Sequence, residues 1–224
     1  MFIGHFAIAF LLMYLFPGVP YWVSLIGVSF PDLLWPFLIV AGVEKVSIKS
    51  ENPLQSGVKF VSYPYSHSFV LSALIELSAS LLVGIITKMV LAMIVFWIAS
   101  LSHWVLDAMV HLRDLPFFGF GKLDRKFGLG LWKMGFIAFA FEYVFYAAFA
   151  ILFLKSAYQI PFLILGAIFH LANSNSFFGF TKKNPFKSST AYAIFVLFGF
   201  CSFIFFSLRI LWLYHMPCII SLAL

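Results

Sequence analysis

Seven apolar segments, each long enough to form a helix, dominate the chain and limit what it can fold into. They lie near residues 2–16, 21–42, 67–87, 89–111, 134–155, 160–178 and 190–216. A helix needs about 20 consecutive apolar residues to cross the hydrocarbon core of a bilayer. The chain is only 10% charged, whereas a soluble domain carries about a quarter charged residues. The sequence therefore predicts an all-α, polytopic membrane protein in which about seven transmembrane helices form one bundle.

The connections between these segments are of two kinds. Pro17–Pro20, Thr87–Lys88 and Ser156–Gln159 are short, and we expect tight turns between antiparallel helices there. The other connections are longer, polar and basic, and they cover residues 43–66, 112–133 and 179–189. The pattern contains no internal repeat or low-complexity segment, so residues 1–224 are expected to form a single domain.

Basic residues are concentrated in the long connections. Seven helices would put these connections and the N-terminus on one side of the membrane. That side carries eleven basic residues, which are Lys45, Lys49, Lys59, Arg113, Lys122, Arg125, Lys126, Lys133, Lys182, Lys183 and Lys187. The other side carries Lys88 and Lys155. Because cytoplasmic loops are enriched in Lys and Arg, the N-terminus is predicted to be cytoplasmic, in a multi-pass protein of the inner membrane. This bias accounts for the net charge of +6, so no nucleic-acid partner is expected.

The end of the fourth segment carries a stripe of ionisable residues. His103, Asp107 and His111 are spaced four residues apart. At about 100° per residue, their side chains share one face of a helix. Imidazoles and carboxylates are ligands of first-row metals and components of proton relays. The alternative is an aromatic-rich helix end whose histidines face the lipid headgroups.

Four further ionisable residues are expected at a similar depth on the same side. His5 lies in the first turn of the first helix, His67 opens the third, and Glu142 lies about two turns into the fifth. Asp32 follows Pro31 near the middle of the second helix, where Pro31 and Pro36 are expected to produce a kink. Taken singly, the histidines can be interfacial and Asp32 can cap a broken helix. Together with the stripe, they predict a site shared by five helices.

The chemistry of these residues fits a metal centre. Neutral imidazoles and carboxylates suit zinc first, with manganese and iron as alternatives. Four histidines and three carboxylates exceed the three protein ligands of a mononuclear catalytic zinc and would suffice for two metals. The candidate catalytic carboxylates are Glu142 and Asp32, either as a general base or as a group that orients a ligand histidine. Arg113 is a candidate substrate-binding residue for phosphate or carboxylate, although the charge bias of the loops also explains it.

Several short motifs carry a resemblance to a known family. They are Met1-Phe-Ile-Gly-His5, Pro31-Asp-Leu-Leu-Trp35, Tyr63-Pro-Tyr-Ser-His-Ser68, Ser102-His-Trp-Val-Leu-Asp107, His111 and Asp114-Leu-Pro116. In this order they resemble the membrane-bound metal-dependent hydrolases of bacterial inner membranes, over residues 1 to about 142. A looser similarity exists to zinc-dependent phospholipase C and nuclease-type phosphoesterases. The chain departs from the family at Tyr63-Pro-Tyr65, where the lead-in to Ser-His-Ser is usually more polar.

The resemblance implies a ligand set and a type of reaction. The implied metal ligands are His5, Asp32, His67, His103 and Asp107, with His111 as an addition. We therefore expect a hydrolase that acts on an ester or phosphoester of a lipid-like substrate at the cytoplasmic leaflet, where basic loops attract anionic headgroups. One alternative is a transporter that uses the His/Asp cluster as a proton or cation site. Another is a non-catalytic scaffold in which the cluster joins helices.

Overall fold

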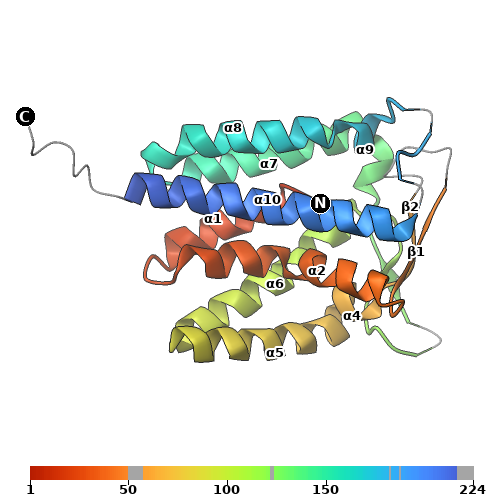
Figure 1. Ribbon diagram of the computed structural model, residues 1–224, viewed down its shortest axis with the longest axis horizontal. Helices are drawn as coiled ribbons and strands as arrows, with labels where there is room; N and C mark the ends of the chain where they lie inside the picture. The colour runs from red at the N-terminus through yellow and green to blue at the C-terminus, as the bar shows by residue number, and fades with distance from the viewer. Residues whose placement is uncertain (50–57, 122–123, 182, 187, 216–224) are drawn as a thin grey trace, which may run out of the picture.

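The computed structural model describes residues 1–49, 58–121, 124–181, 183–186 and 188–215, and it shows a bundle of long helices (Figure 1). A helix covers each of the seven predicted ranges. These helices are α1 (His5–Leu15), α2 (Tyr21–Val40), α5 (Phe69–Thr87), α6 (Val90–Val110), α7 (Phe136–Phe153), α8 (Ser156–Ala172) and α10 (Ser189–His215). Among the described residues, α2, α5, α6, α7 and α10 are long and apolar enough to cross a membrane. The apolar helices α1 and α8 are shorter, with 11 and 17 residues.

The two ends of the bundle differ in the length of the connections between helices, as the sequence predicted. The tight turns lie at one end, and the long connections lie at the other (Figure 1). The long connections contain β1 (Lys45–Ile48), β2 (Val58–Ser62), α4 (Pro64–His67), β3 (Leu115–Pro116), β4 (Lys126–Phe127), a 3-10 helix (Leu131–Met134) and α9 (Ser174–Phe178). Of the basic residues counted above, Lys122, Lys182 and Lys187 lie outside the described residues.

Strands in the long connections were not predicted. β1 pairs with β2 in an antiparallel hairpin, with Val46 opposite Phe60. β3 pairs with β4 over two residues each. These strands are only two to five residues long. Segments that short give no reliable alternation of apolar and polar residues, so the predicted all-α class holds for the bundle but not for its connections.

Two predicted helix boundaries are wrong. His67 does not open the third long helix but ends α4, and Ser68 is the N-cap of α5, where its hydroxyl accepts a hydrogen bond from the amide of Ser72. Ser156–Gln159 is not a turn but the first turn of α8, which ends at Ala172 before α9 begins. Polar residues are tolerated in a first turn because its amides need no partner within the helix.

The helix α2 continues through both of its prolines. Pro31 has no N–H, so the carbonyl of Gly27 loses its partner within the helix. The hydroxyl of Ser100 in α6 donates to that carbonyl instead, at 3.0 Å. Because the helix is not broken, Asp32 lies within it and does not cap it. Both prolines thus leave α2 whole, and Pro31 leaves a carbonyl that joins α2 to α6.

The helix α1 lies inside the bundle rather than at its surface. Ile3, Phe6 and Phe10 are fully buried against side chains of the neighbouring helices. The amides of Phe2 and Gly4, which precede the helix, donate to Oε1 of Glu142 in α7 at 2.5 and 3.1 Å. This contact satisfies backbone groups that would be costly to bury unpaired. The first residues of the chain therefore lie between the helices (Figure 1).

The close approach of α2 and α6 should make Gly27 intolerant of a side chain. A Cβ atom at Gly27 would lie 2.7 Å from Cβ of Ala99 and 3.1 Å from the carbonyl oxygen of Phe96. Gly27→Val is expected to lower the free energy of unfolding by about 1–3 kcal/mol, the usual cost of overpacking. Thermal unfolding in detergent measures this. Gly18→Val is the matched control, because a Cβ at Gly18 meets nothing within 4 Å. Equal melting temperatures for the two variants would contradict the packing described here.

Candidate metal centre

Six of the predicted site residues meet in one cluster inside the bundle. They come from α1, α2, α4, α6 and the residue after α6, and they are His5, Asp32, His67, His103, Asp107 and His111. All but Asp32 are buried, and the side chain of Asp32 is 15% exposed. The spacing of four residues does place His103, Asp107 and His111 together on α6 and its end.

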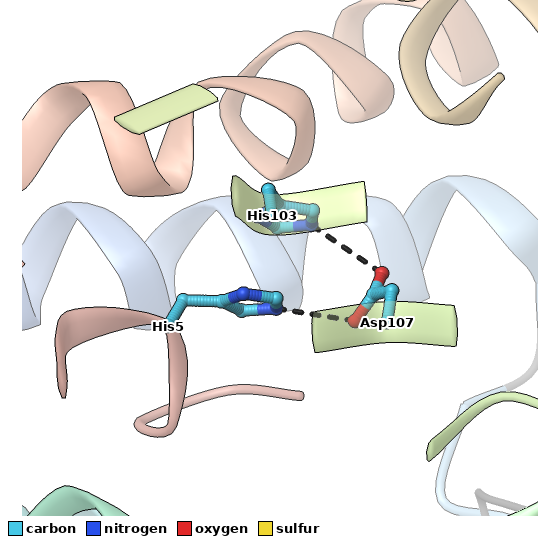
Figure 2. A group of neighbouring side chains, drawn as sticks. All are labelled: His5, His103 and Asp107. Carbon is cyan, nitrogen blue, oxygen red and sulfur yellow. Dashed lines mark ion pairs between the residues drawn. The ribbon is translucent and has the colours of Figure 1, made fainter. Parts of the chain in front are cut away.

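Asp107 occupies the centre of the cluster. Its Oδ1 lies 3.2 Å from Nε2 of His5 and 2.5 Å from the amino group of Met1. Its Oδ2 lies 3.4 Å from Nε2 of His103, 3.3 Å from that of His111 and 3.8 Å from that of His67. Figure 2 shows the rings of His5 and His103 one above the other on the same side of Asp107, both directed toward its carboxylate. The two rings are stacked, with 3.6 Å between their centroids.

The outward nitrogen of His103 is held by the backbone. Its Nδ1 lies 2.7 Å from the carbonyl oxygen of Val28 in α2. A carbonyl oxygen can only accept, so Nδ1 carries the proton, and a neutral ring then presents an unprotonated Nε2 to the cluster. That Nε2 atom makes no hydrogen bond with any described residue. This arrangement leaves a lone pair of His103 free for a cation.

His67 is oriented in a similar way, by a short chain of hydrogen bonds. The hydroxyl of Ser66 donates to Oε2 of Glu44 at 2.6 Å, so its oxygen accepts from Nδ1 of His67 at 2.7 Å. Oε1 of Glu44 accepts from the amides of Tyr65 and Ser66. Burial raises the pKa of Glu44, although the hydroxyl and amide of Ser66 oppose that rise. Again Nε2 is the nitrogen directed into the cluster.

His111 follows the same pattern just beyond the end of α6. Its Nδ1 lies 3.2 Å from Oδ1 of Asp114, while its Nε2 faces Asp107. Burial lowers the pKa of His111, but the carboxylates of Asp107 and Asp114 outweigh burial and raise it overall. The carboxylates at this position therefore favour a positive charge between them.

The distances in the cluster fit a bound metal. Two ligand atoms about 2.1 Å from a tetrahedral zinc are about 3.4 Å apart. Nε2 of His67 and Nε2 of His103 lie 3.3 and 3.5 Å from the oxygens of Asp32, close to that value. Two groups of three residues can hold a metal ion: Asp32, His67 and His103, and His5, His103 and Asp107. They share His103, whose single free Nε2 atom can bind only one metal ion.

A cavity of about 380 Å³ borders the cluster on one side. Asp32, His67, Asp107 and His111 line its inner end. The remaining wall consists mainly of apolar side chains from α8 and α10. Catalytic metals keep one coordination position open for water or substrate. Asp32 and His67 border the cavity, so a metal that they hold would have its open position directed into it.

The other predicted residues lie outside the cluster. Glu142 is buried and accepts the amides of Phe2 and Gly4, so it anchors the chain that carries His5. Arg113 is exposed, donates to the carbonyl of Lys126 at 3.3 Å and does not line the cavity. Two buried ionisable residues that were not predicted for the site also lie outside the cluster. The hydroxyl of Ser72 donates to Glu76 in α5, and Nε2 of His170 donates to the carbonyl oxygen of Phe139.

Three partners of the histidines, and the carboxylate of Glu44 behind one of them, were not predicted from the sequence. Asp114, three residues after His111, and Ser66, next to His67, had been noted only as parts of motifs. The carbonyl of Val28 carries no sequence signal, because any residue has one. Glu44 lies 22 positions from the hydroxyl that it binds, and nothing in the local pattern relates the two.

Comparisons with protein-family models, with curated proteins and with solved structures find no match to this chain. The resemblance to membrane-bound hydrolases therefore stays a prediction, and the case for a metal centre depends on the geometry of the cluster.

Removing the hydroxyl between Glu44 and His67 should weaken metal binding. Ser66→Ala leaves Nδ1 of His67 without an acceptor, and loss of such an orienting partner typically costs 10–100-fold in metal affinity. Competition with a chelator of known affinity measures the change. Ser78→Ala is the control, since the hydroxyl of Ser78 is exposed and bonds only to the carbonyl of Leu74. Equal affinities in the two variants would show that Ser66 does not orient a ligand.

Proposed function

We propose that this protein is a membrane-embedded, metal-dependent hydrolase. The divalent metal, zinc in the first instance, is held by Asp32, His67 and His103, with Oδ2 of Asp107 completing the set. The observation that carries the proposal is that three imidazoles, each held from outside by an acceptor, direct Nε2 toward carboxylates at the inner end of a cavity. Ligand histidines in metal sites are held in this manner.

The proposed topology has seven crossings of the inner membrane. The short helices α1 and α8 then cross with their neighbours, and the N-terminus and the long connections face the cytoplasm. The basic residues of those connections support this orientation. The cluster would lie in the cytoplasmic half of the membrane, within reach of lipid headgroups.

The positions of the residues suggest a role for each in hydrolysis. When bound, a divalent metal polarises the scissile ester or phosphoester and lowers the pKa of water. Asp32 borders the cavity. If one of its oxygens binds the metal, the other can accept the proton of the attacking water and return it to the leaving oxygen. Asp32 is better placed for this than Glu142, whose Oε1 is occupied by two backbone amides. The substrate we propose is lipid-like, and an ester or a phosphoester fits this chemistry equally.

Metal content provides the first test. Purified protein should contain about one divalent metal per chain, because the two groups of ligands share the single free Nε2 of His103. His103→Ala should lose the metal and, with it, hydrolysis of lipid esters in vesicles. His170→Ala should keep both, since His170 lies outside the cluster. The measurements are elemental analysis and the release of fatty acid, for an ester, or of the headgroup, for a phosphoester.

Two results would contradict the proposal. One is wild-type protein that holds no metal after purification without chelator and binds none when metal is added. The other is an Asp107→Ala variant whose melting temperature falls by the same amount with and without added metal. That second result is expected if the cluster only joins helices, because an unpaired buried charge network destabilises by itself.

A second function, proton or cation transport, has one observation in its favour. Ser72, Glu76 and Ser80 lie four residues apart and are buried along one face of α5, and Oε2 of Glu76 has no hydrogen-bond partner among the described residues. Buried ionisable groups of this kind occur in proton relays. If transport is the function, proteoliposomes will show substrate-independent proton or ion flux that Glu76→Gln abolishes. We expect no such flux, and the metal-dependent hydrolysis should survive Glu76→Gln.

A further inference from the structure

The cavity beside the cluster runs along α10. The lining residues Tyr192, Phe195, Gly199, Ser202 and Phe206 recur every three or four positions, so they form one stripe on that helix. The stripe spans 14 residues, which is about 21 Å at 1.5 Å per residue. It therefore extends well beyond the level of the polar cluster and along most of a helix that is long and apolar enough to cross a membrane.

The cavity reaches the outer surface of the bundle. Phe195, Phe198 and Phe206 line it, yet they are 45%, 69% and 48% exposed. The opposite wall is formed by Phe169 and Ala172 of α8, and α8 runs alongside α10 (Figure 1). Phe60 of β2 and Ser176 of α9 also line the cavity, so it reaches the end of the bundle that carries the long connections. The exposed phenylalanines of α10 place part of its wall on the side of the bundle, next to α8.

We propose that the opening between α8 and α10 admits one hydrocarbon chain of a membrane lipid sideways from the bilayer. The inference builds on the proposed hydrolase and names its substrate class: a lipid whose scissile ester or phosphoester is close to the start of its chain. The chain lies along the α10 stripe, and the polar end of the lipid meets Asp32 and His67.

Three properties of the cavity favour a lipid chain as its occupant. Its outer part is lined by phenylalanines, which offer water few hydrogen-bond partners. Its inner part ends at carboxylates and imidazoles, so it is amphipathic in the same sense as a lipid. Its opening faces the region that the apolar surfaces of α8 and α10 place in the membrane, where lipid chains are the solvent.

Gly199 allows the inference to be tested by filling the groove. A Cβ atom at Gly199 would have ordinary contact with the ring of Phe2, at 3.5 Å, so a larger side chain would project into the cavity. Gly199→Trp should exclude the lipid chain while the protein keeps its helical circular dichroism and its metal. Phe205→Trp is the control, since Phe205 is 57% exposed on the same helix and does not line the cavity.

The probe is phosphatidylglycerol that carries a photoactivatable diazirine in the middle of one chain, mixed into phosphatidylcholine vesicles. After irradiation, mass spectrometry of the wild-type protein should find crosslinks enriched on residues 198–206 of α10 and 169–172 of α8. Gly199→Trp should reduce these crosslinks about tenfold relative to those on the outer face of α5, as an overpacked binding site would. Phe205→Trp should not change that ratio.

The outcomes separate this inference from the proposed function. Crosslinks that persist in His103→Ala show that the lipid chain binds without the metal, and the inference then stands even if no hydrolysis is found. Crosslinks spread evenly over all membrane-facing helices, or unchanged in Gly199→Trp, would overturn the lipid groove while leaving the metal centre untouched.

Discussion

The constraint on which the rest of the structure depends is the burial of the Asp107 carboxylate inside an apolar bundle. Moving an ionised group from water into a protein interior costs several kcal/mol unless charges and hydrogen bonds replace the lost water. Around Asp107 that replacement comes from several elements: His5 of α1, His103 of the same helix and His67 of α4. The buried charge is compensated only if each of these elements is in place. The geometry of the cluster and the packing of the helices therefore depend on each other.

The histidines are held from outside the cluster by unlike groups. A backbone carbonyl holds His103, a hydroxyl backed by Glu44 holds His67, and a carboxylate holds His111. All three use Nδ1 for this contact and leave Nε2 for the centre. The outer partners are Val28 of α2, Ser66 and Glu44 in the connection between α2 and α5, and Asp114 in the connection between α6 and α7. The connections at one end of the bundle are therefore part of the site and not merely links between helices.

Much of this arrangement could be predicted from the sequence, for definable reasons. Apolar runs locate the long helices because a bilayer demands them, and the spacing of His103, Asp107 and His111 follows from helical periodicity. The convergence of His5, Asp32 and His67 was predicted because alternate helices run in opposite directions, which puts these residues at a similar depth on the same side. What escaped prediction depends on folding at a distance: the carboxylate of Glu44 beneath Ser66, the short helix that ends at His67, and the carbonyl of Val28. Glu142 was predicted to be a catalytic carboxylate, but it lies outside the cluster and accepts hydrogen bonds from the amides of Phe2 and Gly4, which precede His5.

The proline in α2 has an effect beyond its own helix. Because Pro31 offers no amide, the carbonyl of Gly27 is available to Ser100, and the next carbonyl, that of Val28, binds His103. Two neighbouring carbonyls of α2 thus accept hydrogen bonds from two residues of α6 that are three positions apart. These contacts fix the rotation of α6 about its axis and its position along α2. An ordinary amide at position 31 would compete for the first of these carbonyls. One of the two contacts that align the metal ligands of α6 therefore uses a carbonyl that α2 is unable to pair with itself.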